Sequence, residues 1–551
     1  MNNHNHWFLW VALFLLAASL RLPWPIWDGG IAAHPDERFI LNVAQAVPLG
    51  GSPCADDFSY GHLPLVLVQA LVAVAPEADP LFAARLLSGL VGVLLMAVAG
   101  AWGKALGGER VGLLAGAVIA LAPFPIQEAH FYTVDPLGTI LVSAAVLAAT
   151  RRRWTAAGAL AGLSVACKAS LVWVAIPVLF AAATLNPVPT LNGTLRERIS
   201  KRGLGALIDT RRLLLIGGAA LGAFACVSPW ALLQPVACWR GPWIQAGMAG
   251  GYYDFPYTRQ YAGTLPYFYP LGQLALWGLG PVAALLGLIG LLRALVHWRT
   301  CPPAMRVALV WTGTYFLEMS ALYVKFPRYL LPLYPLWAGW AALLCMTGRE
   351  GRPRPALWRR ACGLALIVGT AVVGAAQLSV YLQPHPWVTA SRWLYATLLP
   401  GESVAVEAWD HPLPVPLPEG ESGAYEGFTL PIFDEESPEK QAALAEAARE
   451  ADVIVLASSR GYGALARQPE RYAETLAWYR EILEEREVIA FGRCPRLGPV
   501  ALTDDPLADA GLPGVLPLTA RCDAPYVLRL PHLDESFRVY DAPTVLLLLK
   551  R

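Results

Sequence analysis

Charged residues are scarce in this chain of 551 residues. Asp, Glu, Lys and Arg make up 15% of it, whereas a soluble protein of this size has roughly 25%. Together with 56% hydrophobic residues and a mean hydropathy of +0.45, this excludes an ordinary soluble enzyme and predicts a polytopic α-helical membrane protein. A bulk charge is also absent, because the net charge is only +1. That balance argues against nucleic acid as a partner.

Sequence motifs for metals and nucleotides are absent too. The nine cysteines form no CxxC or Cys/His metal pattern. No Rossmann glycine fingerprint or nucleotide-phosphate loop occurs in the apolar part of the chain, so no motif there indicates a bound nucleotide. Cys54, Cys238, Cys494 and Cys522 fall in segments that we place outside the membrane, where disulfides form. Of these, Cys494 and Cys522 are the favoured pair.

About eleven apolar segments alternate with loops. They cover residues 7–21, 86–106, 110–126, 134–150, 154–167, 170–185, 213–231, 270–293, 306–323, 329–347 and 361–382. Lys and Arg gather in four connections, at 151–153, 196–212, 293–306 and 349–360, which marks these connections as cytoplasmic. The first loop (22–85) and the carboxyl tail are then outside. We expect residues 61–75 to form a helix that lies in the outer interface or dips back into the membrane, ended by Pro76.

The composition changes at Gln383. Residues 1–382 are predicted to form the membrane domain and residues 383–551 an extracytoplasmic α/β domain. The second part has strand-length apolar runs at 403–408, 453–457, 488–491 and 544–549. Charged helical stretches at 439–450 and 470–487 separate them.

The first candidate motif is Ala-His-Pro-Asp-Glu-Arg-Phe-Ile at residues 33–40. Asp36 and Glu37 are adjacent, so on a helix they point about 100° apart and cannot share one proton. We therefore expect divided roles, with one carboxylate accepting a proton and the other positioning a ligand or a metal. The structural alternative is that both acids only open a helix that starts at Pro35.

A second motif, residues 127–136, contains His130, Thr133 and Asp135 at the same predicted face. Here the alternatives are a helix-capping carboxylate and a hydrogen-bonded structural histidine. The third motif, residues 325–335, offers Lys325 and Arg328 on either side of a proline. A guanidinium fork and a point charge at headgroup depth suit a phosphate, although both side chains could also be interfacial anchors.

Arg85 and Lys168 are further cations at the outer ends of apolar segments. Four cations on the face that carries Asp36 and Glu37 favour an anionic ligand over simple anchoring. The sequence therefore predicts that acids near the amino end and the cations of residues 325–335, much further along the chain, meet in one pocket at the outer boundary of the bilayer.

With these motifs in this order, residues 7–382 resemble the GT-C membrane glycosyltransferases of the protein O-mannosyltransferase and aminoarabinose-transferase type. The resemblance rests on Asp36-Glu37, Arg85-Leu86-Leu87-Ser88, Thr133-Val134-Asp135, the segment 162–168 and Lys325-Phe326-Pro327-Arg328-Tyr329. It implies a sugar donor carried on polyprenyl phosphate, a protein, lipid or glycan acceptor, and a place in the plasma (inner) membrane.

The resemblance also implies an inverting mechanism and residue roles. Asp36 would be the general base, and Glu37 would position the acceptor or a divalent cation, whose ligands would be Asp36, Glu37 and Asp135. The donor phosphate would lie against cationic side chains, namely Lys325, Arg328, Arg85 and Lys168. The pocket would also be lined by His34, His130, Thr133, Asp135 and Tyr329.

Two other classes of protein fit an apolar chain of this length. A lipid or sugar transporter would need ionisable residues along a path through the membrane, but the centres of the apolar segments hold few besides Glu318. A non-catalytic membrane subunit would use the acids only as caps. The arrangement of charges at the outer ends favours the glycosyltransferase.

Overall fold

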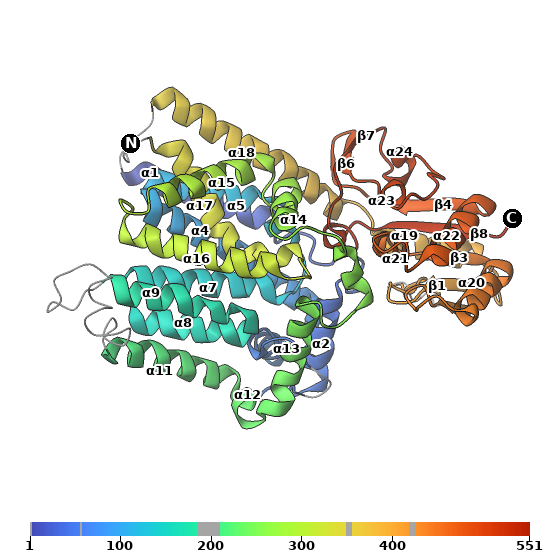
Figure 1. Cartoon of the computed structure of the whole chain (residues 1–551), viewed down its shortest axis with the longest axis horizontal. Helices are drawn as coiled ribbons and strands as arrows, with labels where there is room; N and C mark the ends of the chain where they lie inside the picture. The colour runs from blue at the N-terminus through green and yellow to red at the C-terminus, as the bar shows by residue number, and fades with distance from the viewer. Residues whose placement is uncertain (1–2, 55–57, 186–209, 349–354, 418–419, 421–424) are drawn as a thin grey trace.

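The computed structural model describes residues 3–54, 58–185, 210–348, 355–417, 420 and 425–551. It has a helical bundle with an α/β domain at one end (Figure 1). The long helices of the bundle are α1 (Asn3–Ser19), α4 (Pro80–Gly107), α5 (Glu109–Leu121), α7 (Val134–Thr150), α8 (Trp154–Cys167), α9 (Ala175–Thr184), α11 (Thr210–Val227), α15 (Pro281–Val296), α16 (Pro303–Ala321), α17 (Tyr334–Met346) and α18 (Ala356–Leu378).

Further elements connect these helices at the end that faces the α/β domain. They are α2 (Pro35–Ala46), α3 (His62–Val74), α6 (Pro123–Gln127), α12 (Pro229–Leu233), α13 (Pro235–Ala249), α14 (Phe268–Gln273) and the short turns η1 (Ala169–Val174), η3 (Pro256–Tyr261), η4 (Leu274–Gly278), η5 (Pro327–Leu333) and η7 (Ser379–Leu382). Helix α3 is the helix expected at residues 61–75.

Four helical stretches within the described residues are long and apolar enough to cross a membrane. They are Pro80–Gly107, Thr210–Val227, Pro327–Met346 and Ala356–Thr397. The other predicted segments also contain helices, but these are shorter or interrupted. At residues 270–293, for example, Gly280 adopts a φ of 83° and α15 begins anew at Pro281. The chain is thus a helical membrane protein, and the count of eleven spans stays a prediction.

Glycines let helices α8 and α11 approach closely. A Cβ atom on Gly158 would lie 2.2 Å from the carbonyl oxygen of Ile216, and one on Gly162 would lie 2.1 Å from that of Ala220. Glycines four residues apart on one helix face form the small-residue contact common in membrane helix pairs. The pair α8–α11 forms one side of the pocket described below.

Helix α7 separates Asp135 from one of the predicted cytoplasmic connections, residues 151–153. Its first turn holds Asp135, and residues 151–153 follow its last turn. A helix of 17 residues is about 25 Å long, so these arginines lie at the end of the bundle away from Asp135. The predicted basic connections at 196–209 and 349–354 lie outside the described residues.

The α/β domain contains every strand that the sequence predicted. β1 (Ser403–Glu407), β3 (Val453–Leu456), β4 (Glu487–Gly492) and β8 (Thr544–Leu549) belong to one sheet of order β2-β1-β3-β8-β4, in which β2 (Glu426–Leu430) was not predicted. β1 is parallel to β2 and β3, and β8 is antiparallel to β3 and β4. No pattern in the sequence indicates β2, because this edge strand is largely exposed and has no apolar run.

A second sheet, of order β5-β6-β7, was also not predicted; it comprises β5 (Arg496–Leu497), β6 (Val500–Thr503) and β7 (Tyr526–Arg529). The predicted helical stretches appear as α20 (Pro438–Glu450) and α22 (Ala473–Glu485). The remaining helices are α19 (Pro386–Thr397), α21 (Arg460–Leu465), α23 (Pro506–Asp509), α24 (Leu518–Arg521) and η8 (Glu535–Phe537).

Two disulfides fix segments at the α/β end of the molecule. Cys494–Cys522 lies within the α/β domain, which confirms the favoured pair. Cys54–Cys238 joins the loop before α3 to α13. Disulfides form in oxidising compartments.

Buried aspartates attach the α/β domain to the bundle. Asp534 accepts hydrogen bonds from the hydroxyls of Tyr261 and Tyr269, each at 2.9 Å. Asp541 accepts from the Tyr381 hydroxyl at 2.8 Å and from the Gln377 amide at 2.8 Å. Because these partners come from the bundle, the α/β domain is held over the end that carries α2.

Candidate active site

The amino end of α2 presents the first motif. His34 is its N-cap, and its Nδ1 accepts a hydrogen bond from the Asp36 backbone N–H at 3.2 Å. Pro35 occupies the first helical position, where its missing N–H costs nothing. Burial lowers the pKa of His34 to about 3, so its ring is neutral and can accept this bond. Capping by His34 leaves both carboxylates free for other partners.

Asp36 forms an ion pair with Arg328. Nη1 of Arg328 lies 2.9 Å from Oδ2 of Asp36, and the two side chains are 18% and 13% exposed. The Tyr60 hydroxyl donates a further hydrogen bond to the carboxylate of Asp36. Arg328 also lies over the Phe326 ring, 4.7 Å from its centroid. The structure thus brings the first and third motifs together in one half-buried site.

The Arg328 charge decides the protonation state of Asp36. Burial would raise the pKa of this carboxyl group, but the nearby charges, first that of Arg328, hold it below its usual value. Asp36 is therefore ionised at neutral pH. Any ligand that neutralises Arg328 would raise the pKa of Asp36 and make it a stronger base.

Arg85 on α4 fixes α2 from below. Its guanidinium donates to Glu37 at 2.7 and 2.8 Å, and to Asp28 at 2.7 and 2.8 Å. It also donates to the Pro25 carbonyl at 2.9 Å, and Glu37 accepts from the Tyr132 backbone N–H at 2.9 Å. All three charged side chains of this cluster are buried. The ligand roles expected for Glu37 and Arg85 stay predictions, and these contacts favour a positioning role for both.

A second cation lies beside the Asp36–Arg328 pair. Nζ of Lys168 is 2.6 Å from Oδ1 of Asp135 and 4.8 Å from the centroid of the Tyr329 ring. Thr133 donates to Glu128 at 2.9 Å. Burial, with the charge of Asp135, raises the pKa of Glu128 to about 8, so this buried acid is largely protonated at neutral pH. Glu128 belongs to the second motif, but the sequence analysis did not identify it as a site residue.

His130 and Lys325 contact groups of the protein other than Asp36 and Arg328. The His130 ring stacks on Tyr381, with centroids 3.7 Å apart and planes inclined by 5°, and its Nδ1 donates to the Ile126 carbonyl at 2.8 Å. Nζ of Lys325 donates to the Tyr323 carbonyl at 2.9 Å and to Thr264 at 3.2 Å. Pocket and phosphate roles for these two residues stay predictions that their contacts do not favour.

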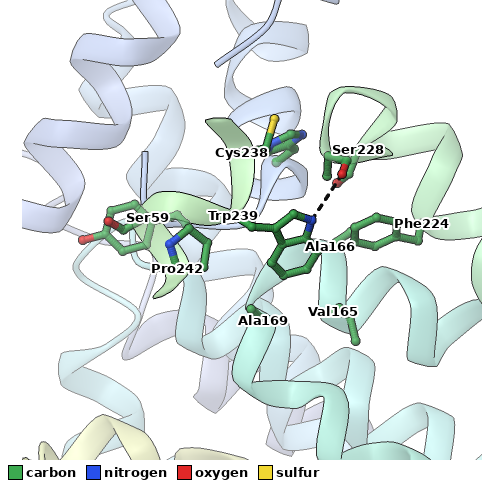
Figure 2. A pocket seen from close by; sticks show the side chains of 13 residues that line it. Ser59, Val165, Ala166, Ala169, Phe224, Ser228, Cys238, Trp239 and Pro242 are labelled. Atoms are coloured by element: carbon green, nitrogen blue, oxygen red, sulfur yellow. Dashed lines mark hydrogen bonds between the residues drawn. The ribbon is translucent and has the colours of Figure 1, made fainter. Parts of the chain in front are cut away.

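An open pocket adjoins the site on the side of Tyr60. It is enclosed by the loop before α3, the carboxyl ends of α8 and α11, and helix α13 (Figure 2). Its lining is mostly apolar, with Val165, Ala169, Phe224, Trp239 and Pro242 among its members. The Trp239 indole donates to the Ala231 carbonyl at 3.2 Å, which fixes the ring across the pocket. Because Tyr60 both lines the pocket and bonds Asp36, the pocket leads to the ion pair.

The α/β domain covers the other side of the site. The Tyr540 ring centroid lies 4.3 Å from that of His34, and Arg38 donates to Nε2 of His411 at 3.1 Å. Arg460 donates to the Tyr540 hydroxyl at 3.1 Å and to Glu535 at 3.1 Å. Sequence reasoning missed these residues, because no motif marks them and their position depends on how two domains dock.

A metal centre was predicted at Asp36, Glu37 and Asp135. In the structure each of these carboxylates faces a different cation, from Arg328, Arg85 and Lys168 respectively. Elsewhere in the described part of the chain, two groups have the spacing of metal ligands: Cys54, His62 and Cys238, and Asp504, Asp509 and His532. The first is committed to a disulfide. A divalent cofactor stays a prediction.

Comparison with known proteins places the fold. No protein-family model and no curated protein matches the sequence. Among solved structures, ArnT from Cupriavidus metallidurans in the apo state superposes with a TM-score of 0.50 at 14% identity, over 82% of this chain and 93% of that one. The oligosaccharyltransferase AglB from Archaeoglobus fulgidus, in complex with an inhibitory peptide and a dolichol-phosphate, gives 0.50 at 15% identity, over 86% and 72%.

Both solved structures are GT-C superfamily glycosyltransferases. The chain therefore has the GT-C fold that its sequence resembles. At these levels of identity the likeness concerns the fold, and the activity has to be argued from the site.

Proposed function

We propose that the chain is a membrane glycosyltransferase that moves a sugar from a polyprenyl-phosphate carrier to an acceptor at the outer face of the membrane. The observation that carries the proposal is the ion pair of Asp36 with Arg328. It joins a candidate base and a candidate phosphate ligand beside an apolar pocket. Neither a simple cap nor an interfacial anchor requires these two side chains to meet.

Asp36 is the general base of the proposed reaction. Its Oδ2 takes the proton from the acceptor hydroxyl or amine, whose freed electron pair attacks the anomeric carbon of the sugar. The bond from that carbon to the carrier phosphate breaks on the opposite face, so the configuration inverts. The electron pair of the broken bond stays on the phosphate oxygen. The products are a glycosylated acceptor and the free carrier phosphate.

Arg328 binds the carrier phosphate and stabilises the charge that grows on it. The donor phosphodiester, which carries one negative charge, takes the place of the carboxylate on the guanidinium, with which it can make a bidentate contact. The second negative charge develops on the phosphate as the sugar leaves, and Arg328 stabilises it there. Lys168 lies close enough to add a second charge, and its field also acts on Asp36. Glu37 and Arg85 hold α2 so that Asp36 faces this point.

The apolar pocket beside Tyr60 takes the first isoprene units of the carrier. It is lined by aliphatic and aromatic side chains from the outer ends of span helices, where a lipid chain can enter from the bilayer. The similarity to AglB supports a lipid-phosphate ligand, since that structure contains a dolichol-phosphate. Neither the sugar nor the acceptor follows from these residues.

The proposed topology has about eleven spans in the plasma (inner) membrane, with the site and the α/β domain outside. Two disulfides near the site and in the α/β domain support an oxidising side. The arginines at 151–153, at the far end of α7, support a cytoplasmic opposite end.

The test uses the full chain in proteoliposomes with radiolabelled sugars on undecaprenyl phosphate and an envelope extract as acceptor. We expect Asp36→Asn to lower the release of free carrier about a hundredfold or more and to retain binding of undecaprenyl phosphate. Arg328→Gln should weaken that binding. Asp79→Asn is the matched control, because Asp79 is an exposed acid that caps α4 and asparagine caps equally well.

Three outcomes would contradict the proposal. Full activity of Asp36→Asn would remove the base. Unchanged carrier binding by Arg328→Gln would remove the phosphate site. Movement of labelled lipid across the vesicle membrane without formation of a glycosidic bond would identify a transporter instead.

A further inference from the structure

The carboxyl ends of β1 and β3 lie side by side in the α/β domain. β1 lies between β2 and β3 and is parallel to both. The chain leaves β1 toward β2 and returns through α20 to β3 on the other side. In open sheets of parallel strands, ligands bind where the connections diverge in this way. In this domain the point is formed by the loops 408–411 and 457–460.

Hydrogen bonds fix these two loops to each other. The Ser458 hydroxyl donates to Oδ2 of Asp410 at 2.6 Å and accepts from the Arg460 backbone N–H at 3.1 Å. The Arg460 guanidinium donates to the Trp409 carbonyl at 3.3 Å. The positions of the two loops are therefore fixed before any ligand arrives.

The loop 408–411 contacts helix α2. His411 contacts Arg38 on α2, and the Trp409 ring centroid lies 6.5 Å from that of Tyr257, with the planes inclined by 50°. The Tyr257 ring centroid lies 6.5 Å from that of Phe326, over which the Arg328 guanidinium lies. Trp409 is thus two rings away from the cation that pairs with Asp36.

Trp409 has an unusual backbone and an unburied side chain. It is one of six described residues other than glycine with positive φ, at 67°, and it is 56% exposed. A bulky residue in this region is strained, and burial of its ring does not compensate for the strain. Strained residues cluster at binding sites. The carboxylate of Asp410 follows directly, so an apolar face and a hydrogen-bond acceptor are presented together.

We propose that Trp409 and Asp410 form a sugar-binding subsite in the roof of the active site. The C–H face of a pyranose or furanose ring stacks on the indole, and ring hydroxyls donate to the carboxylate of Asp410. The inference rests on the proposed function and extends it, because it assigns sugar recognition to the α/β domain. The sugar comes either from the donor or from a glycan acceptor.

The test measures binding of three methyl glycosides (of mannose, galactose and arabinose) to the full chain in nanodiscs by saturation-transfer NMR. We expect at least one to bind, and Trp409→Gly to weaken its binding about tenfold or more. Glycine adopts positive φ without strain, so this variant should fold. Trp409→Tyr should retain binding. Trp24→Gly is the matched control, because Trp24 is also an exposed tryptophan with positive φ, of 58°.

Absence of glycoside binding by the wild-type chain, or binding unchanged in Trp409→Gly, would overturn the subsite. Equal loss in Trp24→Gly would also overturn it, since the effect would then be a general one. A saturating lipid-linked sugar that displaces the glycoside assigns the subsite to the donor, whereas persistence of the glycoside assigns it to the acceptor. Asp36→Asn should retain glycoside binding, so a failed subsite and a failed glycosyltransferase proposal give different results.

Discussion

Replacing Arg85 by Met tests the charge cluster beneath α2. The substitution keeps an unbranched apolar stem but removes five hydrogen bonds, and it leaves Asp28 and Glu37 buried without their cation. Breaking a buried ion pair by removing one partner costs about 3–5 kcal/mol. We therefore expect a loss of that size in the free energy of unfolding, measured by thermal denaturation of the chain in detergent.

The pH dependence of this loss identifies its cause. Burial would raise the pKa of Asp28, but Arg85 holds it well below its usual value in the wild type. Without Arg85, burial dominates and the pKa of the carboxyl rises. The variant can then relieve the buried charge by binding a proton, so its deficit relative to the wild type should shrink as the pH falls from 8 toward 5.

Lys104→Met is the matched control for Arg85→Met. Lys104 lies on the same helix and pairs with Glu109 at 2.6 Å, but its side chain is 60% exposed. An exposed pair contributes about 0–1 kcal/mol, so this variant should melt almost like the wild type. A deficit in stability for Arg85→Met no larger than that of the control, or one that is constant with pH, would refute the stabilising role of the charge cluster formed by Arg85, Asp28 and Glu37.

Three further variants test other parts of the structure. Substituting Ser for both Cys494 and Cys522, which are separated by 28 residues in sequence, should lower the free energy of unfolding by about 3.5 kcal/mol in denaturation experiments without reductant, and reductant should remove the difference. Glu128→Gln should flatten the pH dependence of the melting temperature: since the folded pKa is raised from 4.5 to about 8, wild-type stability falls as the pH rises through that window. His34→Ala should cost about 1 kcal/mol through loss of the cap, and an unaltered melting temperature would show that the cap contributes little.

Some features of the site were predictable because charge is scarce in this chain. An acid or a cation at the end of an apolar segment has few polar partners, so a meeting of the acids with the cations could be anticipated. Which acid pairs with which cation could not be predicted. Asp28 lies in a loop without periodicity. Nothing in the sequence indicates that Arg85 binds Asp28 and Glu37 rather than a phosphate. The contacts of His130 likewise depend on Tyr381, far along the chain.

In the α/β domain, too, some elements could be predicted from the sequence pattern and others depend on tertiary packing. Buried strands such as β3 and β8 are continuous apolar runs and are visible in the sequence. β2 and β7 are largely exposed and β5 has only two residues, so these strands leave no such signal. Tyr540 and Arg460 reach the site only because two domains dock. No local pattern encodes that contact.

In the proposed mechanism, the ion pair of Asp36 and Arg328 links carrier binding to activation of the base. While the two are paired, Arg328 keeps the carboxylate ionised but weakly basic, which limits reaction with stray acceptors. A phosphate that takes over Arg328 removes this charge from Asp36, so the pKa of the carboxyl rises when the donor is in place. The neutral His34 ring cannot replace the lost cation. On this argument the base becomes competent only in the presence of donor, and the acid and the cation must lie in contact for that order to hold.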